Sequence, residues 1–177
     1  MRCLIRHAKD HPYFATGMLF ALGVVVASLA FADRQIVVNT SPSVAPGLYL
    51  RSRDAPAVGR LVDFRVPAAA AEFVRLRTHG RTDGRNWYIL KPIAAGPGDN
   101  VDCTGRWLVI NGRRVALMPP AVDDAGHPLP VWRGCRTLAD DEFFVFSGRI
   151  PNSFDSRCYG PIRRGEIEAV RRPLITW

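Results

Sequence analysis

Short runs of alternating hydrophobic and polar residues make up most of the chain after its first 33 positions. Residues 59–66 (GRLVDFRV) alternate as half-buried strands do. Similar β-prone runs occur at 34–39, 86–93, 107–117, 141–146 and 165–176. Asn111-Gly112, between two such stretches, predicts a type I′ hairpin. Because strands do not alternate with helices, the pattern predicts a single, mainly β domain with antiparallel pairing.

One helix and two turn-rich segments interrupt these strands. Residues 67–77 (PAAAAEFVRLR) predict a helix that begins at Pro67. The turn-rich segments are 39–49 (NTSPSVAPGLY) and 149–160 (RIPNSFDSRCYG). Functional groups tend to lie on loops held by a rigid scaffold, so we expect the chemistry in these two segments.

An uncharged apolar run, Pro12–Ala32, precedes the strands. About 20 apolar residues span a bilayer as a helix, so this run predicts a transmembrane anchor. Arg2, Arg6 and Lys9 precede it against one acid, Asp10. The positive flank predicts a cytoplasmic segment at 1–11 and an exported domain at 33–177. The alternative is a signal peptide cleaved after Ala32, at the site Ala30-Phe31-Ala32.

Export changes the interpretation of the cysteines. Cys103, Cys135 and Cys158 would lie in an oxidising compartment, where disulfides persist. Cys103 and Cys135 bracket a loop-rich insertion, so we expect a disulfide between them, with Cys158 left over. Pairing of Cys103 with Cys158 stays open. The chain has no CxxC motif and no Cys/His cluster, so zinc is not expected.

The positive charge is dispersed along the chain. The formal net charge is +8, of which the N-terminal segment supplies +2, leaving +6 on the exported part. Scattered arginines favour a solvated basic face near an anionic membrane surface, and no nucleic-acid-binding motif is present. Nucleic acid is therefore not an expected partner.

Lys91 is the most unusual cation in the sequence. Among 24 Lys+Arg the chain has two lysines, Lys9 and Lys91, and Lys91 lies in an apolar run, 86–93 (NWYILKPI). A buried ammonium can lose its proton and act as a base, whereas guanidinium cannot. Together with Ser41 and Ser43 in the first turn-rich segment, Lys91 predicts a serine/lysine hydrolase. The alternative for Lys91 is a strand-edge side chain whose amine reaches water.

Two other catalytic mechanisms have less support in the sequence. A Ser/His/Asp triad would need His79 or His127, and both stand in polar turn contexts. Metal-dependent hydrolysis lacks a ligand set, because these two histidines are isolated in the sequence. We therefore expect neither a metal nor any other cofactor.

Three segments resemble a known family. They are SPSVAP (41–46), YILKPIAAGPGDNV (88–101) and NSFDSRCYGPI (152–162), and they resemble three sequence boxes of the type I signal peptidases, in the same order. The forms SVAPGLY and LKPIAAGPGD look most like the conjugative-transfer branch, the TraF-type peptidases that mature pilin precursors. The resemblance covers essentially the whole chain and implies a signal-peptidase-like fold.

The resemblance also implies roles for individual residues. Ser43 would be the nucleophile and Lys91 the general base. Ser41 would join the Ser43 backbone N–H in the oxyanion hole, and Ser153 would hold the lysine amine. Asp155 and Arg157 would form an ion pair that shapes the floor of the site. Val44, Pro92 and Cys158 depart from the common family pattern, and none of these departures removes a catalytic group.

These observations predict a membrane-anchored serine endopeptidase in the inner membrane, with a periplasmic catalytic domain. Its partner would be a pilin or another secreted precursor protein. The alternative from another class is a non-catalytic envelope assembly protein that binds pilus or secretion components. Whether water or the substrate's own amine resolves the acyl-enzyme stays open, as does the oligomeric state.

Overall fold

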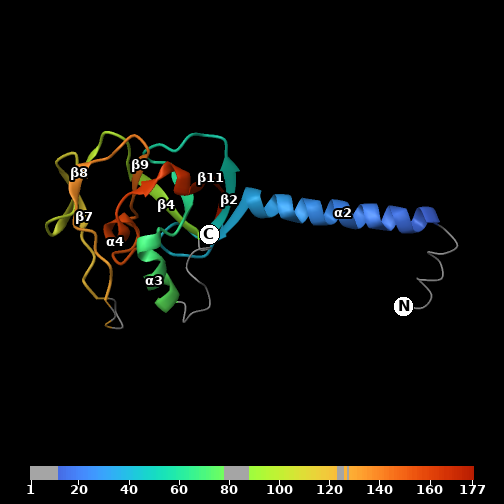
Figure 1. Ribbon diagram of the computed structural model, residues 1–177, viewed down its shortest axis with the longest axis horizontal. Coiled ribbons are helices and arrows are strands. Elements are labelled where there is room, and N and C mark those ends of the chain that lie inside the picture. Colours follow the sequence, from blue (N-terminus) through green and yellow to red (C-terminus); the bar gives the residue numbers. More distant parts are fainter. Residues whose placement is uncertain (1–11, 78–87, 123–125, 127) are drawn as a thin grey trace. The chain divides into compact units, whose positions relative to one another are not determined.

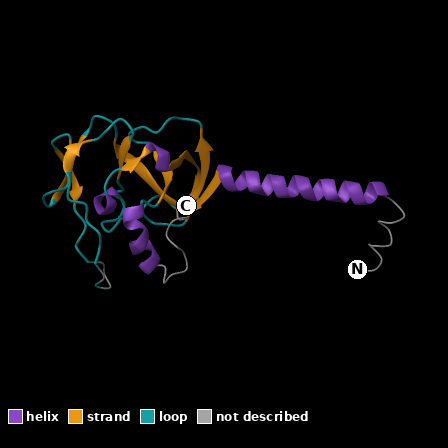
Figure 2. Ribbon diagram, in the orientation of Figure 1, coloured by secondary structure: helices purple, strands orange, loops and turns teal. Residues whose placement is uncertain are grey.

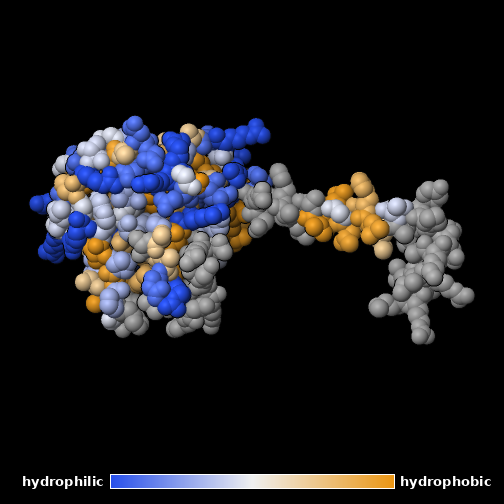
Figure 3. All heavy atoms as spheres, viewed as in Figure 1, coloured by the Kyte–Doolittle hydropathy of each residue, from blue (hydrophilic) through white to orange (hydrophobic). Residues whose placement is uncertain are grey.

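The computed structural model describes residues 12–77, 88–122, 126 and 128–177, and the chain divides into two units, Met1–Val37 and Val38–Trp177. The first unit contains the helix α2, Pro12–Gln35. Its large apolar side chains from Met18 to Val26 are exposed, and they are visible in orange in Figure 3. Among the residues that the structure describes, no helix is long and apolar enough to cross a membrane.

Two antiparallel sheets follow helix α2 in the chain, visible as two groups of strands in Figure 2. The larger sheet has seven strands in the order β1 (Ile36–Asn39), β2 (Gly47–Ser52), β11 (Ile167–Thr176), β3 (Leu61–Arg65), β4 (Tyr88–Ala95), β9 (Glu142–Val145) and β10 (Ile162–Arg163). The smaller has four, in the order β7 (Arg113–Leu117), β6 (Trp107–Ile110), β5 (Asn100–Asp102) and β8 (Cys135–Thr137). The mainly β, antiparallel prediction is confirmed, with two sheets.

Three short helical elements complete the second unit. They are α3 (Ala68–Arg77), α4 (Ser156–Tyr159) and the 3-10 turn η1 (Arg164–Glu166), and α3 and α4 are labelled in Figure 1. Helix α3 confirms the prediction for 67–77. The hairpin prediction is confirmed too, because Asn111 and Gly112 join β6 to β7 with φ of 49° and 76°, as a type I′ turn requires.

Strand β9 separates two hydrophobic cores. Its residues Phe143 and Val145 pack with Val62 and Phe64 in one cluster, whereas Phe144 packs with Val101 in the other. Successive side chains of a strand point to opposite faces, so β9 contributes to both cores and is buried throughout. This double burial explains why residues 143–146 (FFVF) are all apolar.

The interior of the larger sheet also holds an ion pair. Arg171 of β11 donates two hydrogen bonds to Asp63 of β3, at 2.9 and 2.8 Å, and both side chains are buried. A bidentate geometry of this kind satisfies both charges where water is excluded. The pair therefore fixes the β3–β11 alignment inside the sheet.

The predicted disulfide between Cys103 and Cys135 is absent, because Cys103, Cys135 and Cys158 are all free thiols. Cys135 lies opposite Asp102 in the β5–β8 register, so the next residue, Cys103, points to the other face of the sheet. Cys103 is buried in the second core, whereas Cys135 is exposed. Cys158 is buried as well.

Gly47, the first residue of β2, marks a close backbone contact. A Cβ atom at this position would lie 2.2 Å from the Ile175 carbonyl oxygen of β11. We expect Gly47→Ala to lower the stability of the full chain by about 1–3 kcal/mol, as overpacking does. Thermal unfolding followed by circular dichroism measures this loss.

The matched control is Gly105→Ala, where an added Cβ would meet no atom within 4 Å. Equal melting temperatures for the two variants would contradict the predicted contact.

Candidate active site

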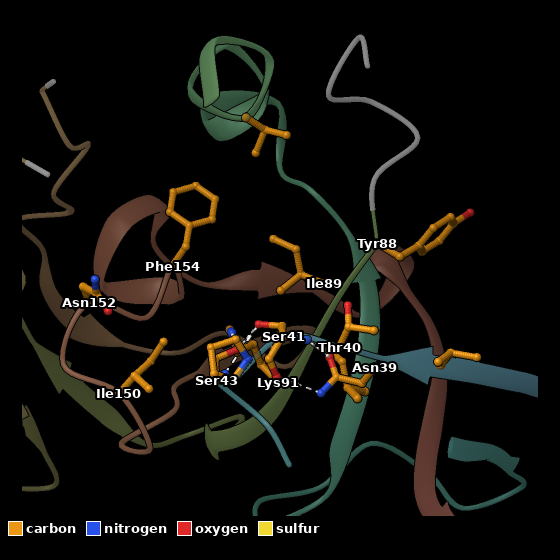
Figure 4. A pocket seen from close by; sticks show the side chains of 14 residues that line it. Asn39, Thr40, Ser41, Ser43, Tyr88, Ile89, Lys91, Ile150, Asn152 and Phe154 are labelled. Atoms are coloured by element: carbon orange, nitrogen blue, oxygen red, sulfur yellow. Dashed lines mark hydrogen bonds between the residues drawn. The ribbon is translucent and has the colours of Figure 1, made fainter. Parts of the chain in front are cut away.

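Ser43 and Lys91 meet in the second unit although they come from distant segments (Figure 4). Ser43 lies in the connection between β1 and β2, here called the serine loop (residues 40–46), and Lys91 lies in β4. The Lys91 Nζ and Ser43 Oγ atoms are hydrogen-bonded, and each residue is only 4% exposed. The strand-edge alternative, with the Lys91 amine in water, is therefore wrong.

Lys91 lies on a segment of β4 that is paired along one edge only. Strand β3 pairs with β4 from Tyr88 to Pro92, whereas β9 pairs with it only at Ile93 and Ala95. Among the described strands, none pairs with the other edge of residues 88–91. The serine loop and a cavity lie alongside these residues.

The electrostatic surroundings weaken the hold of Lys91 on its proton. Burial, with a smaller contribution from the positive charge of Arg157, lowers the pKa of Lys91 from 10.5 to about 8, although the negative charge of Asp155 acts in the opposite direction. About half of the amine is therefore neutral near pH 8. An arginine at this position would stay charged.

Ser41 lies beside Ser43 within the serine loop. The two hydroxyl oxygens are 3.0 Å apart, and the Ser43 backbone N–H donates to Ser41 Oγ at 3.5 Å. We predicted that two groups form an oxyanion hole, namely the Ser41 hydroxyl and the Ser43 backbone N–H. Both groups lie close to Ser43 Oγ in the serine loop.

Three further side chains hold the serine loop, and the sequence analysis missed all of them. Asn39, at the end of β1, donates to the carbonyls of Ser41, Val44 and Ala45. Ser147 donates its hydroxyl to the Ser43 carbonyl, and Tyr49 donates to the Ala45 carbonyl at 2.5 Å. Only Asn39 carried a sequence signal, because Asn often bonds to nearby backbone groups in turns.

Asp155 and Arg157 form the predicted ion pair. Arg157 donates to both Asp155 oxygens, at 2.9 and 3.0 Å, and both side chains are buried. Arg157 also donates to the Leu117 carbonyl at 2.8 Å and lies over the Phe146 ring. Asp155 accepts the Ser147 backbone N–H at 3.4 Å, so the pair connects to the residue that bonds the Ser43 carbonyl.

Ser153 differs from the sequence-based expectation. Its hydroxyl is buried and has no hydrogen-bond partner among the described residues, so it does not hold the Lys91 amine in this structure. His79 and His127, the candidates for a triad, lie outside the described residues. The described part of the chain contains no group of three or more potential metal ligands.

A cavity of about 530 Å³ opens next to Ser43 and Lys91. Its walls come from the end of β1, the serine loop, the open edge of β4, α3 and the 150–154 segment (Figure 4). The lining residues are Val38, Asn39, Thr40, Ser41, Pro42, Ser43, Val74, Tyr88, Ile89, Leu90, Lys91, Ile150, Asn152 and Phe154. Ligand pockets of this size are common, and the mixed lining suits a peptide with small side chains.

Comparison with known proteins now gives the family. The family model for "Signal peptidase, peptidase S26" matches residues 11–176. The chain belongs to the signal peptidase S26 family. Because the serine loop, β4 and the 150–160 segment all fall inside the matched range, the site described above lies wholly within the signal peptidase S26 region.

Individual relatives specify the branch. A plasmid transfer protein TraF from Escherichia coli is 34% identical over 146 residues, covering 79% of this chain and 82% of that protein. A conjugal transfer protein TraF from Agrobacterium tumefaciens (strain 15955) is 25% identical over 180 residues, covering 98% and 99%. A crystal structure of a signal peptidase I from Enterococcus faecalis V583 aligns with a TM-score of 0.41 and 18% identity, over 67% of this chain and 98% of that one. The resemblance to the TraF branch of the S26 signal peptidases is confirmed.

The two-lysine composition allows a direct measurement of the Lys91 pKa. In full-length protein labelled with ¹³C at the lysine side chains, we expect two signals, with Lys91 titrating near pH 8 because it is buried. The Lys9→Arg variant assigns the signals, since it leaves only Lys91.

Unfolding in guanidinium provides the control, because exposure should return the Lys91 midpoint to about 10.4. A native Lys91 signal that titrates above pH 10 would contradict the desolvated amine.

Proposed function

We propose that this protein is a serine endopeptidase in which Ser43 is the nucleophile and Lys91 the general base. The observation that carries the proposal is the buried Lys91 amine hydrogen-bonded to Ser43 Oγ. A pKa of about 8 for Lys91 suits a general base, which works best when its pKa is near the working pH. Membership of the signal peptidase S26 family supports the same chemistry.

The reaction begins with the neutral Lys91 amine. It takes the Ser43 hydroxyl proton as Oγ attacks the scissile carbonyl carbon, and the carbonyl oxygen becomes an oxyanion. The Ser43 N–H and the Ser41 hydroxyl are suitably near to donate to that oxyanion, an interaction worth about 2.7–4 kcal/mol per donor. Lys91 then returns the proton to the leaving amine, and the peptide C–N bond breaks.

An ester between Ser43 and the N-terminal fragment remains after this step. Lys91, neutral again, accepts a proton from the incoming nucleophile as that nucleophile attacks the ester carbonyl. The tetrahedral species collapses, the C–O bond to Ser43 breaks and Oγ recovers a proton. Water as the nucleophile gives a free carboxylate, and a substrate amine gives a new peptide bond.

The substrate we propose is an extended segment of an exported precursor, such as a pilin. The unpaired edge of β4 at residues 88–91 supports this, because an added strand satisfies open backbone groups. The cavity beside this edge would take small side chains on the N-terminal side of the scissile bond. Relatives named as plasmid and conjugal transfer proteins support a precursor of the transfer apparatus.

We further propose that residues 12–32 anchor the protein in the inner membrane, with residues 1–11 cytoplasmic and the catalytic domain periplasmic. The uncharged run and its basic flank support this topology. A shared membrane would raise the effective concentration of enzyme and precursor.

Membrane extraction tests the anchor. The full chain should stay with the membrane pellet after alkaline carbonate treatment, whereas a chain without residues 1–32 should be released. Release of the full chain would contradict the anchor.

The peptidase proposal predicts loss of cleavage in two variants. A diverse library of synthetic extended peptides is incubated with the full chain, and the products are read by mass spectrometry. Wild type should cut after small residues, whereas Ser43→Ala and Lys91→Arg should lose at least about 10²-fold in kcat, the lower bound for removing a general base. Lys91→Arg keeps the charge but cannot give up a proton.

Lys9→Arg is the matched control, because it makes the same substitution outside the site and should cut like wild type. The peptidase proposal fails if wild type cuts no peptide in the library. It also fails if Ser43→Ala or Lys91→Arg cuts as fast as wild type, and the non-catalytic assembly role would then be favoured.

A further inference from the structure

We propose that Asn39 is a positioning residue that sets the catalytic geometry of Ser41 and Ser43. The inference rests on the proposed peptidase function and adds a residue to it. Asn39 has no hydrogen bond to Ser43 Oγ or Lys91 Nζ among the bonds described for it. It acts on the backbone to either side of Ser43.

The Asn39 carboxamide forms four hydrogen bonds with the serine loop and its flank. Its Nδ2 group donates to the carbonyls of Ser41, Val44 and Ala45 at 3.0, 3.0 and 3.1 Å. Its Oδ1 atom accepts the Ser41 N–H at 3.2 Å. One buried side chain, 8% exposed, therefore binds the backbone both before and after Ser43.

These bonds fix Ser41 more fully than its neighbours. Both the N–H and the carbonyl of Ser41 bond to Asn39, so the Ser41 backbone is held at both ends. That orientation places the Ser41 hydroxyl 3.0 Å from Ser43 Oγ. Asn39 is the last residue of strand β1, so these hydrogen bonds connect the serine loop to the larger sheet.

The position requires the chemistry of a short amide. Three carbonyls need a donor, which an amide nitrogen supplies and a carboxylate does not. Aspartate would keep the acceptor for the Ser41 N–H but would turn negative oxygen toward three carbonyl oxygens. Asn39→Asp thus separates the donor role of Asn39 from ordinary turn formation, which aspartate supports as well as asparagine.

A direct contact with substrate is the competing role, because Asn39 also lines the cavity. Loss of a substrate contact that is equal in the ground and transition states raises KM and leaves kcat unchanged. Loss of catalytic geometry lowers kcat, and a misplacement of about 1 Å can cost about 10²-fold. The two roles therefore differ in measurable constants.

The test uses the full chain and the library peptide that wild type cuts fastest. We expect Asn39→Ala to lower kcat on the order of 10²-fold with KM unchanged, and Asn39→Asp to be no better than Asn39→Ala. The pH dependence of kcat should still give a pKa near 8 for Lys91, since Asn39 does not act on Lys91. Asn100→Ala, on the smaller sheet, is the matched control and should retain wild-type kcat.

A double-mutant cycle with Ser41→Ala gives the decisive readout. If Asn39 acts by orienting Ser41, much of the loss caused by Asn39→Ala should vanish in the Ser41→Ala background, because coupled residues are non-additive. A merely structural role would give the same fold-loss in both backgrounds. Thermal unfolding of each variant shows that folded proteins are being compared, and Asn39→Ser, which keeps one donor, is measured in parallel.

Several outcomes would overturn the inference. They are a rise in KM with unchanged kcat, full rescue by Asn39→Asp, additive losses in the cycle, or the failure of all three Asn39 variants to fold. Each of these leaves wild-type cleavage and its dependence on Ser43 intact, so the peptidase proposal survives. Failure of the peptidase proposal is a different result, namely Ser43-independent cleavage or none by wild type.

Discussion

The burial of one amine beside one hydroxyl is the constraint on which the rest of this structure depends. Lys91 can lose its proton near neutral pH only while water is kept away from it, and desolvation is the largest cause of its lowered pKa. The Lys91 side chain is buried, and Ser43 of the serine loop is hydrogen-bonded to its amine. The loop must therefore be held tightly, although it has no regular secondary structure and contains two prolines, Pro42 and Pro46.

The Asp155–Arg157 pair solves an electrostatic problem created by this burial. A lone Asp155 would stabilise the charged form of Lys91 and raise its pKa, whereas the charge of Arg157 lowers it. Paired, the two side chains supply hydrogen bonds to the surrounding backbone while their effects on Lys91 oppose each other. The pair can thus order the 147–157 segment without forcing Lys91 to stay protonated.

Much of this arrangement could be predicted from the sequence, where the signal was local. A few adjacent residues were enough to predict the hairpin at Asn111-Gly112 and the helix at 67–77. The same is true of Lys91, which stands out because its neighbours are apolar. Strands β5, β8 and β10 could not be predicted, because they have only two or three residues each and depend on pairing. The contact between Ser147 and Ser43 joins residues 104 apart, and no local pattern encodes it. The expected disulfide failed for a related reason, since sequence spacing does not reveal which face of a strand a cysteine occupies.

The open edge at residues 88–91 bears on the state in which a substrate can be processed. An edge of this kind binds backbone, and a backbone is available only before a protein has used its own hydrogen-bonding groups in folding. A mature domain that has already folded presents far fewer such segments, because most of its backbone groups are paired internally. In the function proposed here, the competition between cleavage and folding would decide which proteins are processed, and the timing of export would contribute to selectivity alongside the side chains near the cut.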